Sequence, residues 1–427
     1  MKFPNCIINH PINKHWKEEA TNTHIWGRSS RSIGLERVKE DSTNFKSYNL
    51  TQAQKMADTA AAAAPPSLSF PRSTFAKLSP HPYLLTTLSP QTPGVPPSRT
   101  NGRAPDEARP VQIQAGSLSH AHGSALVRIG DTTVLCGVRG EVLPVTSIPQ
   151  YRPRSNESYE GEETDEGYEE LKNYDLLVPN IELATGCAPH FLPGVPPTTL
   201  AQTVSTRVYS LLHSCGAVDP QNLRIWYTPE QQARHQQELD QKMDTDNEDD
   251  DQDDENDESR KPQLMAYWVL YIDLLFVSFD GNPFDAAWMA VMAALRDTKL
   301  PQARWDPDRE MVVCSRKEGS QTKLNVRGLP VACTATVFLE KEHGLAEGVG
   351  AGGNRHWILL DPDRLEENLC KEQITMVVDC GREGGGEEEV RIKALEKQGG
   401  VVVGRELIRG FASVAEKRWR EVKQAMK

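Results

Sequence analysis

One stretch of the chain, residues 267–301, carries residue types whose spacing could hold a phosphate. It begins with an apolar run rich in Val, Ile, Tyr and Phe, which predicts a long strand buried on both faces. Asp280 and Gly281 then form a turn signal. Asn282 can cap a helix, and Pro283 suits the first turn of that helix. A helix N-terminus at the end of a strand can bind an anion through its backbone N–H groups. Whether this corner binds phosphate therefore decides whether the chain is predicted to be an enzyme or a scaffold protein.

The helix predicted after this turn is amphipathic. Its apolar residues fall on one face at helical spacing, namely Phe284, Ala287, Trp288, Val291, Met292 and Leu295. Asp285 lies in the first turn, where its negative charge stabilises the helix dipole but repels an approaching anion.

The composition bounds the number of domains and the classes of partner. A length of 427 residues predicts two or three domains, and an apolar fraction of 38% indicates that disordered stretches dilute an ordinary core. The formal net charge is −12, but residues 230–260 alone carry fourteen acidic and three basic side chains. The acidity therefore belongs to an insert and says little about the folded body, which is near neutral.

The eight cysteines include no C-x-x-C pair, and most lie inside apolar runs. This usage predicts buried free thiols in a reducing compartment rather than zinc ligands or disulfides. No His, Cys and Asp cluster has metal spacing, and neither a P-loop nor a dinucleotide-binding motif is present, so no metal or cofactor is expected. No stretch is long and apolar enough for a membrane span, and the N-terminus lacks the apolar core of a secretory signal.

The N-terminal part of the chain has little periodic pattern. Residues 1–68 are polar and aperiodic and are predicted to be a disordered extension. Met56 is a plausible independent start, so residues 1–55 could be an upstream extension of the reading frame. Residues 69–109 are predicted to be an arm and linker that begins with one or two short helices, and folded structure is expected to start near Pro110.

Two successions of strands and helices follow. Residues 110–305, with the insert 230–260, are predicted to form one domain and residues 306–427 a second one. Residues 149–174 are expected to be a surface loop. The predicted elements are a hairpin over 124–138, strands over 176–183, 223–228, 311–315, 323–326, 331–339, 357–361, 374–380 and 389–396, and helices over 199–214 and 402–423. This order predicts an α+β fold with two halves.

Three blocks of sequence resemble the RNase PH family, and the resemblance covers about residues 96–425. The blocks are GSALVRIGDTTVLCGV, LVPNIELATGCAPHFLPG and WVLYIDLLFVSFDGNPFDAAWMAVMAALRD. The stretch RTNGR resembles the family's R-x-D-G-R opening, with Asn101 in place of the Asp. The second and third blocks look most like a ring subunit of the eukaryotic RNA exosome. The resemblance implies the RNase PH fold of two βαβα halves, a ribosomal-protein-like domain followed by a smaller C-terminal domain, in a six-membered ring around an RNA channel.

Active members of this family cleave RNA from its 3′ end with inorganic phosphate as the nucleophile. In them the corner resembles G-G-T-R or G-T-R, where the Thr hydroxyl, the helix amides and the Arg hold the phosphate. Here Pro283 replaces the Thr and removes an amide donor, while Phe284 replaces the Arg and offers neither charge nor hydrogen bonds. Together with Asp285, these replacements predict a degenerate phosphate corner.

The resemblance also implies a pair of acids just before a late strand in active bacterial members. Aligning that strand with residues 374–378 puts Gln373 at the later acid and Glu367 at the earlier one. An amide cannot act as a general acid or base at neutral pH, so no catalytic residue is expected here. If the alignment slips by one residue, Glu372 takes the later position instead.

Four residues are candidates for contact with RNA. Arg207 resembles a position where a related archaeal ring subunit carries an RNA-contacting Arg, and His190 stands where close relatives carry Arg. Arg152 and Arg154 lie in a segment that resembles the pore-lining loop, although neighbouring acids would weaken their field. For Arg207 and His190 the alternative is an ordinary solvated or packed side chain. Contacts of this kind with phosphates are independent of the RNA sequence and sensitive to salt.

Arg103 and Arg109 are expected to have a structural role instead. Two acids, Asp106 and Glu107, lie close to both arginines in the sequence. This spacing predicts local ion pairs within the linker.

Together these features predict a non-catalytic structural subunit of an exosome core ring. Such a subunit would pair with other RNase PH-like ring subunits and with cap subunits. It would help to form a channel for single-stranded RNA and support 3′–5′ RNA processing and degradation, including rRNA maturation, by an associated nuclease. The expected location is the nucleus and nucleolus and also the cytoplasm, with no membrane partner. The alternatives are a phosphate-dependent 3′–5′ exoribonuclease, active alone or with a ring partner, and an acidic interaction protein that binds through residues 230–260.

Overall fold

The structure is a computed structural model, and the residues that it describes lie within Phe70–Lys427. The described residues are 71–90, 93–149, 151, 165–228, 262–317, 319–340, 356–381, 389–400 and 403–426. Several expectations lie outside these residues: the extension 1–68 with its start at Met56, the arginines Arg152 and Arg154, and the acidic insert 230–260.

The arm that precedes the first sheet is part of the folded unit. It forms α1 (Arg72–Leu78) and α2 (Pro80–Leu88), the short helices predicted from the sequence. Leu84 and Leu88 are buried against Phe338 and Leu359, which belong to the second sheet. The expectation that folded structure starts near residue 110 is therefore wrong, because the arm contributes its own small apolar cluster.

The first sheet is mostly antiparallel and follows the order β1-β2-β3-β6-β4. Its strands are β1 (Val111–Ala115), β2 (Gly123–Ile129), β3 (Thr132–Pro144), β4 (Leu177–Leu183), β5 (Arg224–Tyr227) and β6 (Gln263–Ser278), and β5 also pairs with β6. The predicted hairpin is confirmed, since β2 and β3 pair around a turn in which Gly130 has a φ of +57°. Among the described strands, β6 is the longest and pairs with β3, β4 and β5, of which only β4 runs parallel to it.

The strand β6 is buried on both faces only in its first half. Residues 266–270 are all buried, but along the second half Asp273, Leu275 and Val277 are exposed while the residues between them are buried. The expectation of a strand buried on both faces is therefore wrong for the second half. In the part of the chain that the structure describes, helices cover the inner face of this sheet and leave the outer face of β6 open.

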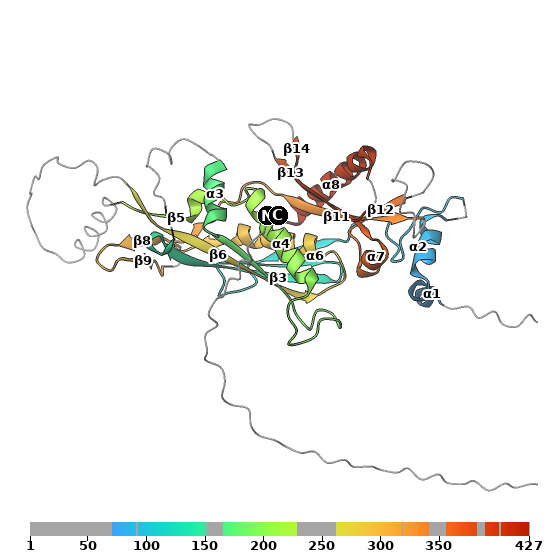
Figure 1. The fold of residues 1–427 in the computed structure, drawn as a ribbon, viewed down its shortest axis with the longest axis horizontal. Helices are drawn as coiled ribbons and strands as arrows, with labels where there is room; N and C mark the ends of the chain where they lie inside the picture. The colour runs from blue at the N-terminus through green and yellow to red at the C-terminus, as the bar shows by residue number, and fades with distance from the viewer. Residues whose placement is uncertain are drawn as a thin grey trace, which may run out of the picture. The chain divides into compact units, whose positions relative to one another are not determined.

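The helix α6 (Pro283–Asp297) is buried all round rather than along one face. Every residue from Pro283 to Leu295 is buried, because α6 contacts β2 and β3 of the first sheet and β11 of the second (Figure 1). The amphipathic pattern predicted its inner face correctly and missed the second contact. Trp288 illustrates both contacts, since its ring is in the core and its Nε1–H donates to the Pro330 carbonyl at 2.8 Å.

The second sheet is antiparallel and follows the order β12-β11-β13-β14. Its strands are β11 (Val331–Leu339), β12 (His356–Leu360), β13 (Glu372–Gly381) and β14 (Glu389–Gln398). The terminal helix α8 (Arg405–Ala425) packs on β13 and β11 and buries Phe411 and Trp419. A short helix that the sequence analysis missed, α7 (Arg364–Leu369), joins β12 to β13 and begins with a capping box between Asp363 and Glu366.

Shorter elements complete the unit. The helix α4 (Thr199–Ser214) spans the residues predicted for it and packs on β4. The helix α3 (Asp165–Asn173) lies in the segment expected to be a surface loop, and that expectation is wrong because Leu171 is buried in the core. Of the strand expected over 323–326, only the first residue, Lys323, lies in a strand, because β10 ends there. The remaining elements are η1 (Val145–Ser147), η3 (Pro220–Leu223), the pair β7 (Lys299–Leu300) and β10 (Thr322–Lys323), and the pair β8 (Ala303–Asp306) and β9 (Met311–Cys314).

The two sheets with their helices give the α+β architecture that the sequence predicts. The division at residue 305 into two domains stays a prediction, since both sheets share α6. All described cysteines are free thiols, and Cys136, Cys187, Cys215, Cys333 and Cys380 are buried. No helix among the described residues is long and apolar enough to cross a membrane.

Candidate functional site

The candidate site is the corner where β6 ends and α6 begins, and here the chain takes a conformation that few residues tolerate. Gly281 has a φ of +79° and Asn282 a φ of +48°, both in the left-handed region. A Cβ atom on Gly281 would lie 2.6 Å from the backbone N of Arg364 and the carbonyl carbon of Asp363. Glycine therefore allows the start of α7 to rest directly on the corner.

Asn282 holds this corner by bonds to side chains rather than by capping α6. Its side chain makes no capping hydrogen bond, which corrects the expectation from the sequence. Instead Nδ2 donates to Asp285 Oδ2 at 2.9 Å and to Asp361 Oδ1 at 2.8 Å. The amide thus joins the first turn of α6 to the end of β12, and asparagine tolerates the left-handed backbone better than most residues.

A carboxylate from α7 occupies a backbone donor at the corner. The N–H group of Asn282 donates to Glu367 Oε1 at 2.7 Å. Burial raises the pKa of Glu367 to about 7, although the hydrogen bond from Asn282 opposes this shift. Glu367 therefore takes the place at this N–H group that an oxygen of a bound anion would otherwise take.

The aromatic ring at the next position is covered by a cation from another helix. Phe284 is 2% exposed, and the Arg207 guanidinium of α4 lies 3.8 Å from its ring centroid. Arg207 also donates from Nε to Glu396 at 2.6 Å and from Nη2 to Thr375 Oγ1 at 2.9 Å. A positive charge is thus present beside the corner, but β13 and β14 already neutralise and bind it.

Asp285 points into the protein interior. Its Oδ2 accepts from the Thr334 backbone N–H at 2.8 Å, and its Oδ1 accepts from the Thr334 hydroxyl at 2.6 Å. Burial raises the pKa of Asp285, while these hydrogen bonds act in the opposite direction. The side chain is 4% exposed, so its role is to bond α6 to β11 rather than to face an anion arriving from solvent.

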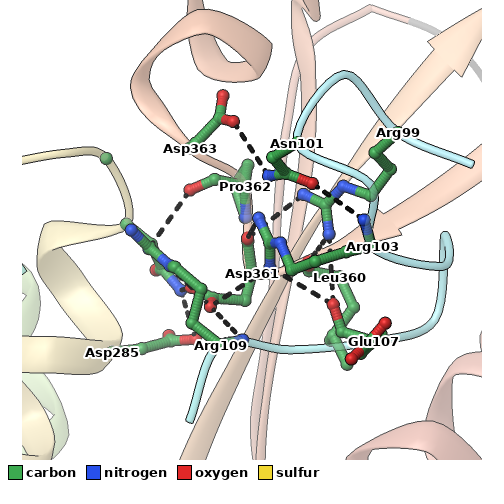
Figure 2. A network of polar contacts seen from close by, with 12 residues as sticks. Arg99, Asn101, Arg103, Glu107, Arg109, Asp285, Leu360, Asp361, Pro362 and Asp363 are labelled. Carbon is green, nitrogen blue, oxygen red and sulfur yellow. Dashed lines mark hydrogen bonds and ion pairs between the residues drawn. The ribbon is translucent and has the colours of Figure 1, made fainter. Parts of the chain in front are cut away.

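Beside the corner, the linker before β1 is fastened by a network of arginines around Asp361 (Figure 2). Arg109 donates from Nε and Nη2 to the two carboxylate oxygens of Asp361 at 2.8 Å each, and its backbone N–H adds a third bond at 2.9 Å. Burial opposes ionisation of Asp361, but the bonds and charge of Arg109 outweigh it and lower the pKa to about 2.

The other two arginines of the linker join the same network. Arg99 is fully buried and pairs with Glu366, with Nε donating at 2.7 Å, while its Nη1 donates to the Leu360 carbonyl at 2.6 Å. Arg103 donates to the backbone carbonyls of Glu107 and Asp361 at 3.2 Å each. A structural role is as expected, but the carboxylate partners predicted within the linker are wrong. The observed partners are Asp361, which directly follows β12, and Glu366 of α7.

The two acid positions near β13 do not meet at the corner. Gln373 lies in β13 opposite Thr336 of β11 and Gln398 of β14. Glu372 is buried, where it accepts from the Gly400 backbone N–H at 2.8 Å and lies 3.4 Å from Lys397 Nζ. Of the acids weighed for these two positions, Glu367 reaches the corner and Glu372 does not.

Of the four candidates for RNA contact, the structure describes two. His190 is exposed, and its ring lies 4.0 Å from that of Phe191 and 6.1 Å from that of Phe279 at the end of β6. Its pKa is lowered by desolvation and by the positive charge of Arg364. Arg207 is the residue stacked on Phe284 and is 13% exposed. Contact of either residue with RNA stays a prediction.

Sequence reasoning missed the residues that fill the corner from far along the chain. Arg109 and Asp361 are 252 positions apart, and Asn282 and Glu367 are 85 apart. The RTNGR stretch was a signal that Arg99 and Arg103 matter. No local pattern indicated their partners, because ion pairs between distant segments leave no periodicity in the sequence.

Comparison with known proteins supports this architecture. Residues 107–301 match the family model described as 3′ exoribonuclease family, domain 1. Residues 107–301 are an RNase PH family domain. The match covers the first sheet, α4 and α6, so the corner at Asn282 lies inside the RNase PH domain.

Relatives of the chain include named components of exosome complexes. The chain is 28% identical over 315 residues to "Exosome complex component rrp43" of Schizosaccharomyces pombe, which covers 74% of this chain and 86% of that protein. It is 25% identical over 292 residues to "Exosome complex component Rrp42" of Aeropyrum pernix, covering 68% and 75%. A solved structure described as "archaeoglobus fulgidus exosome with RNA bound to the active site" aligns with 83% of this chain and all of that chain, with a TM-score of 0.52 and 23% identity, and shows the shared RNase PH fold.

Proposed function

We propose that this chain is a non-catalytic structural subunit of an exosome core ring. The names of its relatives support the ring, and the corner between β6 and α6 supports the absence of catalysis. The observation that carries the second part is the bond from the Asn282 N–H to Glu367 at 2.7 Å, beside a Phe284 covered by Arg207. The donors and the cation that would hold an inorganic phosphate are bound by the chain's own residues.

In this role the subunit pairs with other RNase PH-like ring subunits and with cap subunits. It contributes one part of the wall of a channel for single-stranded RNA, and an associated nuclease carries out 3′–5′ processing and degradation. We place it in the nucleus and nucleolus and also in the cytoplasm. The RNA-contact candidates are those considered above, namely His190 and Arg207, together with Arg152 and Arg154.

The assembly is tested by purification of the full-length chain from its own cells, followed by quantitative mass spectrometry. The expected result is recovery of RNase PH-like chains in equal amounts. Recovery of the chain as a lone monomer would overturn the ring assignment. Deletion of residues 230–260 should leave this stoichiometry unchanged, whereas an acidic interaction protein would lose its partners.

The absence of catalysis is tested by incubating the purified chain, alone and with its ring partners, with single-stranded RNA and inorganic phosphate. No nucleoside diphosphates are expected from this subunit. In a ring that does release nucleoside diphosphates, Glu367→Gln should leave the rate unchanged. A rate that falls with this variant would assign a catalytic acid to Glu367 and support the phosphorolytic enzyme instead, since a carboxyl group with a pKa near 7 is suited to acid–base catalysis.

A further inference from the structure

The outer face of the first sheet carries a concavity, and none of the corner residues lines it. Its volume is about 540 Å³, and it lies over β3, β6 and β4 with the turn between β1 and β2 as one wall. Its apolar lining includes Leu118, Leu135 and Leu275, and its polar lining includes Arg139, Glu182 and Asp273. All of its lining residues belong to the described part of the chain.

The strand register places these side chains in rows on one face. Leu135 of β3, Leu275 of β6 and Glu182 of β4 are cross-strand neighbours. The next row is Gly137, Asp273 and Asn180. Side chains in such rows point to the same side of the sheet, so the concavity has a row of two leucines and Glu182 beside a row that carries Asp273 and Asn180.

Gly137 shapes the floor of this concavity. A Cβ atom at this position would lie 3.1 Å from Leu118 Cδ1. The missing side chain allows Leu118 of the β1–β2 turn to fold onto the sheet, where the Leu118 N–H bonds to Ser124 Oγ at 2.8 Å. The wall is therefore held in place by the turn that precedes β2.

Large apolar side chains remain open to solvent here. Leu118 is 39% exposed, Leu275 37% and Val277, next along the same face of β6, 52%. An apolar cluster of this kind with a polar rim is typical of a surface that binds another protein.

The rim carries negative charge that no cation among the described residues neutralises. Asp273 accepts one bond, from Asn180 Nδ2 at 3.2 Å, and within the described residues neither Asp273 nor Glu182 pairs with a cation. Arg139 is the nearby cation, but it pairs with Glu141 at 3.2 Å and lies over the Tyr271 ring. The rim therefore attracts a positively charged partner group.

We propose that this concavity is the docking site of a neighbouring RNase PH-like chain, which inserts an apolar side chain flanked by a Lys or Arg. The inference rests on the proposed ring function and names the surface that such a neighbour uses. The apolar anchor contacts Leu118 and Leu275, and the basic group pairs with Asp273 and Glu182. A second copy of this chain in a symmetric contact would bring the same carboxylates together, and RNA would bring phosphates to them, so both are repelled.

The location is tested by placing the photo-crosslinker p-benzoylphenylalanine at position 275 of the full-length chain, assembling the ring, and sequencing the crosslinked peptides. The expected product joins position 275 to an RNase PH-like neighbour, at a peptide where an apolar residue adjoins Lys or Arg. Position 395 is the control, since Leu395 is 47% exposed on β14 and lies in a different sheet. Crosslinks from position 275 only to a second copy, only to RNA, or to nothing in an assembled ring would overturn the proposal.

The chemistry is tested by the affinity for the neighbour identified in this way. Leu275→Asp should weaken binding by at least about 30-fold, as for a buried apolar anchor, while Leu395→Asp should not change it. Glu182→Lys should weaken binding more than Glu182→Gln, and the difference should shrink in high salt. Leu118→Glu is a second variant at the wall, in case Leu275→Asp does not fold. Unchanged affinity in the folded variants overturns the proposal.

Failure of this inference differs from failure of the proposed function. If the wild-type chain enters the ring in equal amounts but Leu275→Asp enters as well as wild type, only the docking site is wrong. If the wild-type chain does not enter a ring, both are wrong.

Discussion

The corner after β6 and the outer face of β6 belong to the same stretch of chain, yet they satisfy their polar groups in opposite ways. At the corner, the Asn282 N–H group bonds to Glu367, and Asp285 bonds to Thr334. On the outer face, Asp273 and Leu275 remain exposed. The N–H donors of Asn282 at the corner are thus bonded within the chain, whereas the outer face is available to another molecule.

The physical reason for the difference is burial. A buried donor or charge without a partner costs about 1–3 kcal/mol or more, so the buried donors and carboxylates of the corner are bonded within the fold, and Asn282 Oδ1 is a buried acceptor there with no described partner. Exposed groups keep their water and can remain unpaired until another protein displaces it. The comparison predicts that substitutions at the corner act on stability and that substitutions on the outer face act on assembly.

The largest effect is expected from removing the charge that holds the linker. Asp361→Asn breaks the bonded pair with Arg109 and leaves a buried guanidinium with only the more exposed carboxylate of Asp280, 3.7 Å away, which should lower the free energy of unfolding by roughly 3–5 kcal/mol. Asp131→Asn is the control, because Asp131 pairs with Arg128 on the surface and should change stability by less than about 1 kcal/mol. Urea unfolding measures the free energy of unfolding of both variants. Equal losses for the two would contradict the contrast between buried and exposed charges.

A smaller loss is expected from uncovering the ring at the corner. Arg207→Ala removes the guanidinium stacked on Phe284 and its bonds to Glu396 and Thr375, which should cost about 2 kcal/mol. Arg139→Ala is matched to it, because Arg139 also stacks on a ring and pairs with an acid but is 61% exposed. Arg139→Ala should change the free energy of unfolding by no more than about 0.5 kcal/mol. If Arg207→Ala left the free energy of unfolding unchanged, the Arg207 guanidinium would be available to bind RNA.

The corner carboxylate should make stability depend on pH. The pKa of Glu367 is raised from 4.5 to about 7, so folding favours the protonated form of this group. The wild type should therefore lose stability relative to Glu367→Gln as pH rises from about 5 to about 7, by roughly 1–2 kcal/mol. Unfolding of both proteins by urea across this range gives the difference, and a difference that stays constant with pH would place Glu367 in solvent.

The smallest effect on stability is expected on the outer face. Leu275→Asp should change the free energy of unfolding of the isolated chain by less than about 0.5 kcal/mol, because the side chain is already partly in water. Phe284→Asp, which places a charge in the core, should prevent stable folding. Thermal unfolding compares them, and a large loss for Leu275→Asp alone would show that the outer face is part of the core.

Local patterns in the sequence were sufficient for most elements. The helix Thr199–Ser214 and the strand Val331–Leu339 have the limits predicted for them, because periodicity and capping act within a few residues. The helix Asp165–Asn173 was missed because its composition is polar, with Tyr168 and Leu171 as its large apolar residues. The replacements Pro283 and Phe284 were also readable directly, since the chemistry that each removes depends on the residue type alone.

What the sequence determined by itself is therefore the order of elements and which groups the corner lacks. Only the tertiary structure decided what fills it: Glu367 at the Asn282 N–H, Arg207 over Phe284, and a helix α6 buried between two sheets. These contacts join segments that lie far apart along the chain. They depend on which surfaces meet after folding, and no spacing within the sequence encodes that meeting.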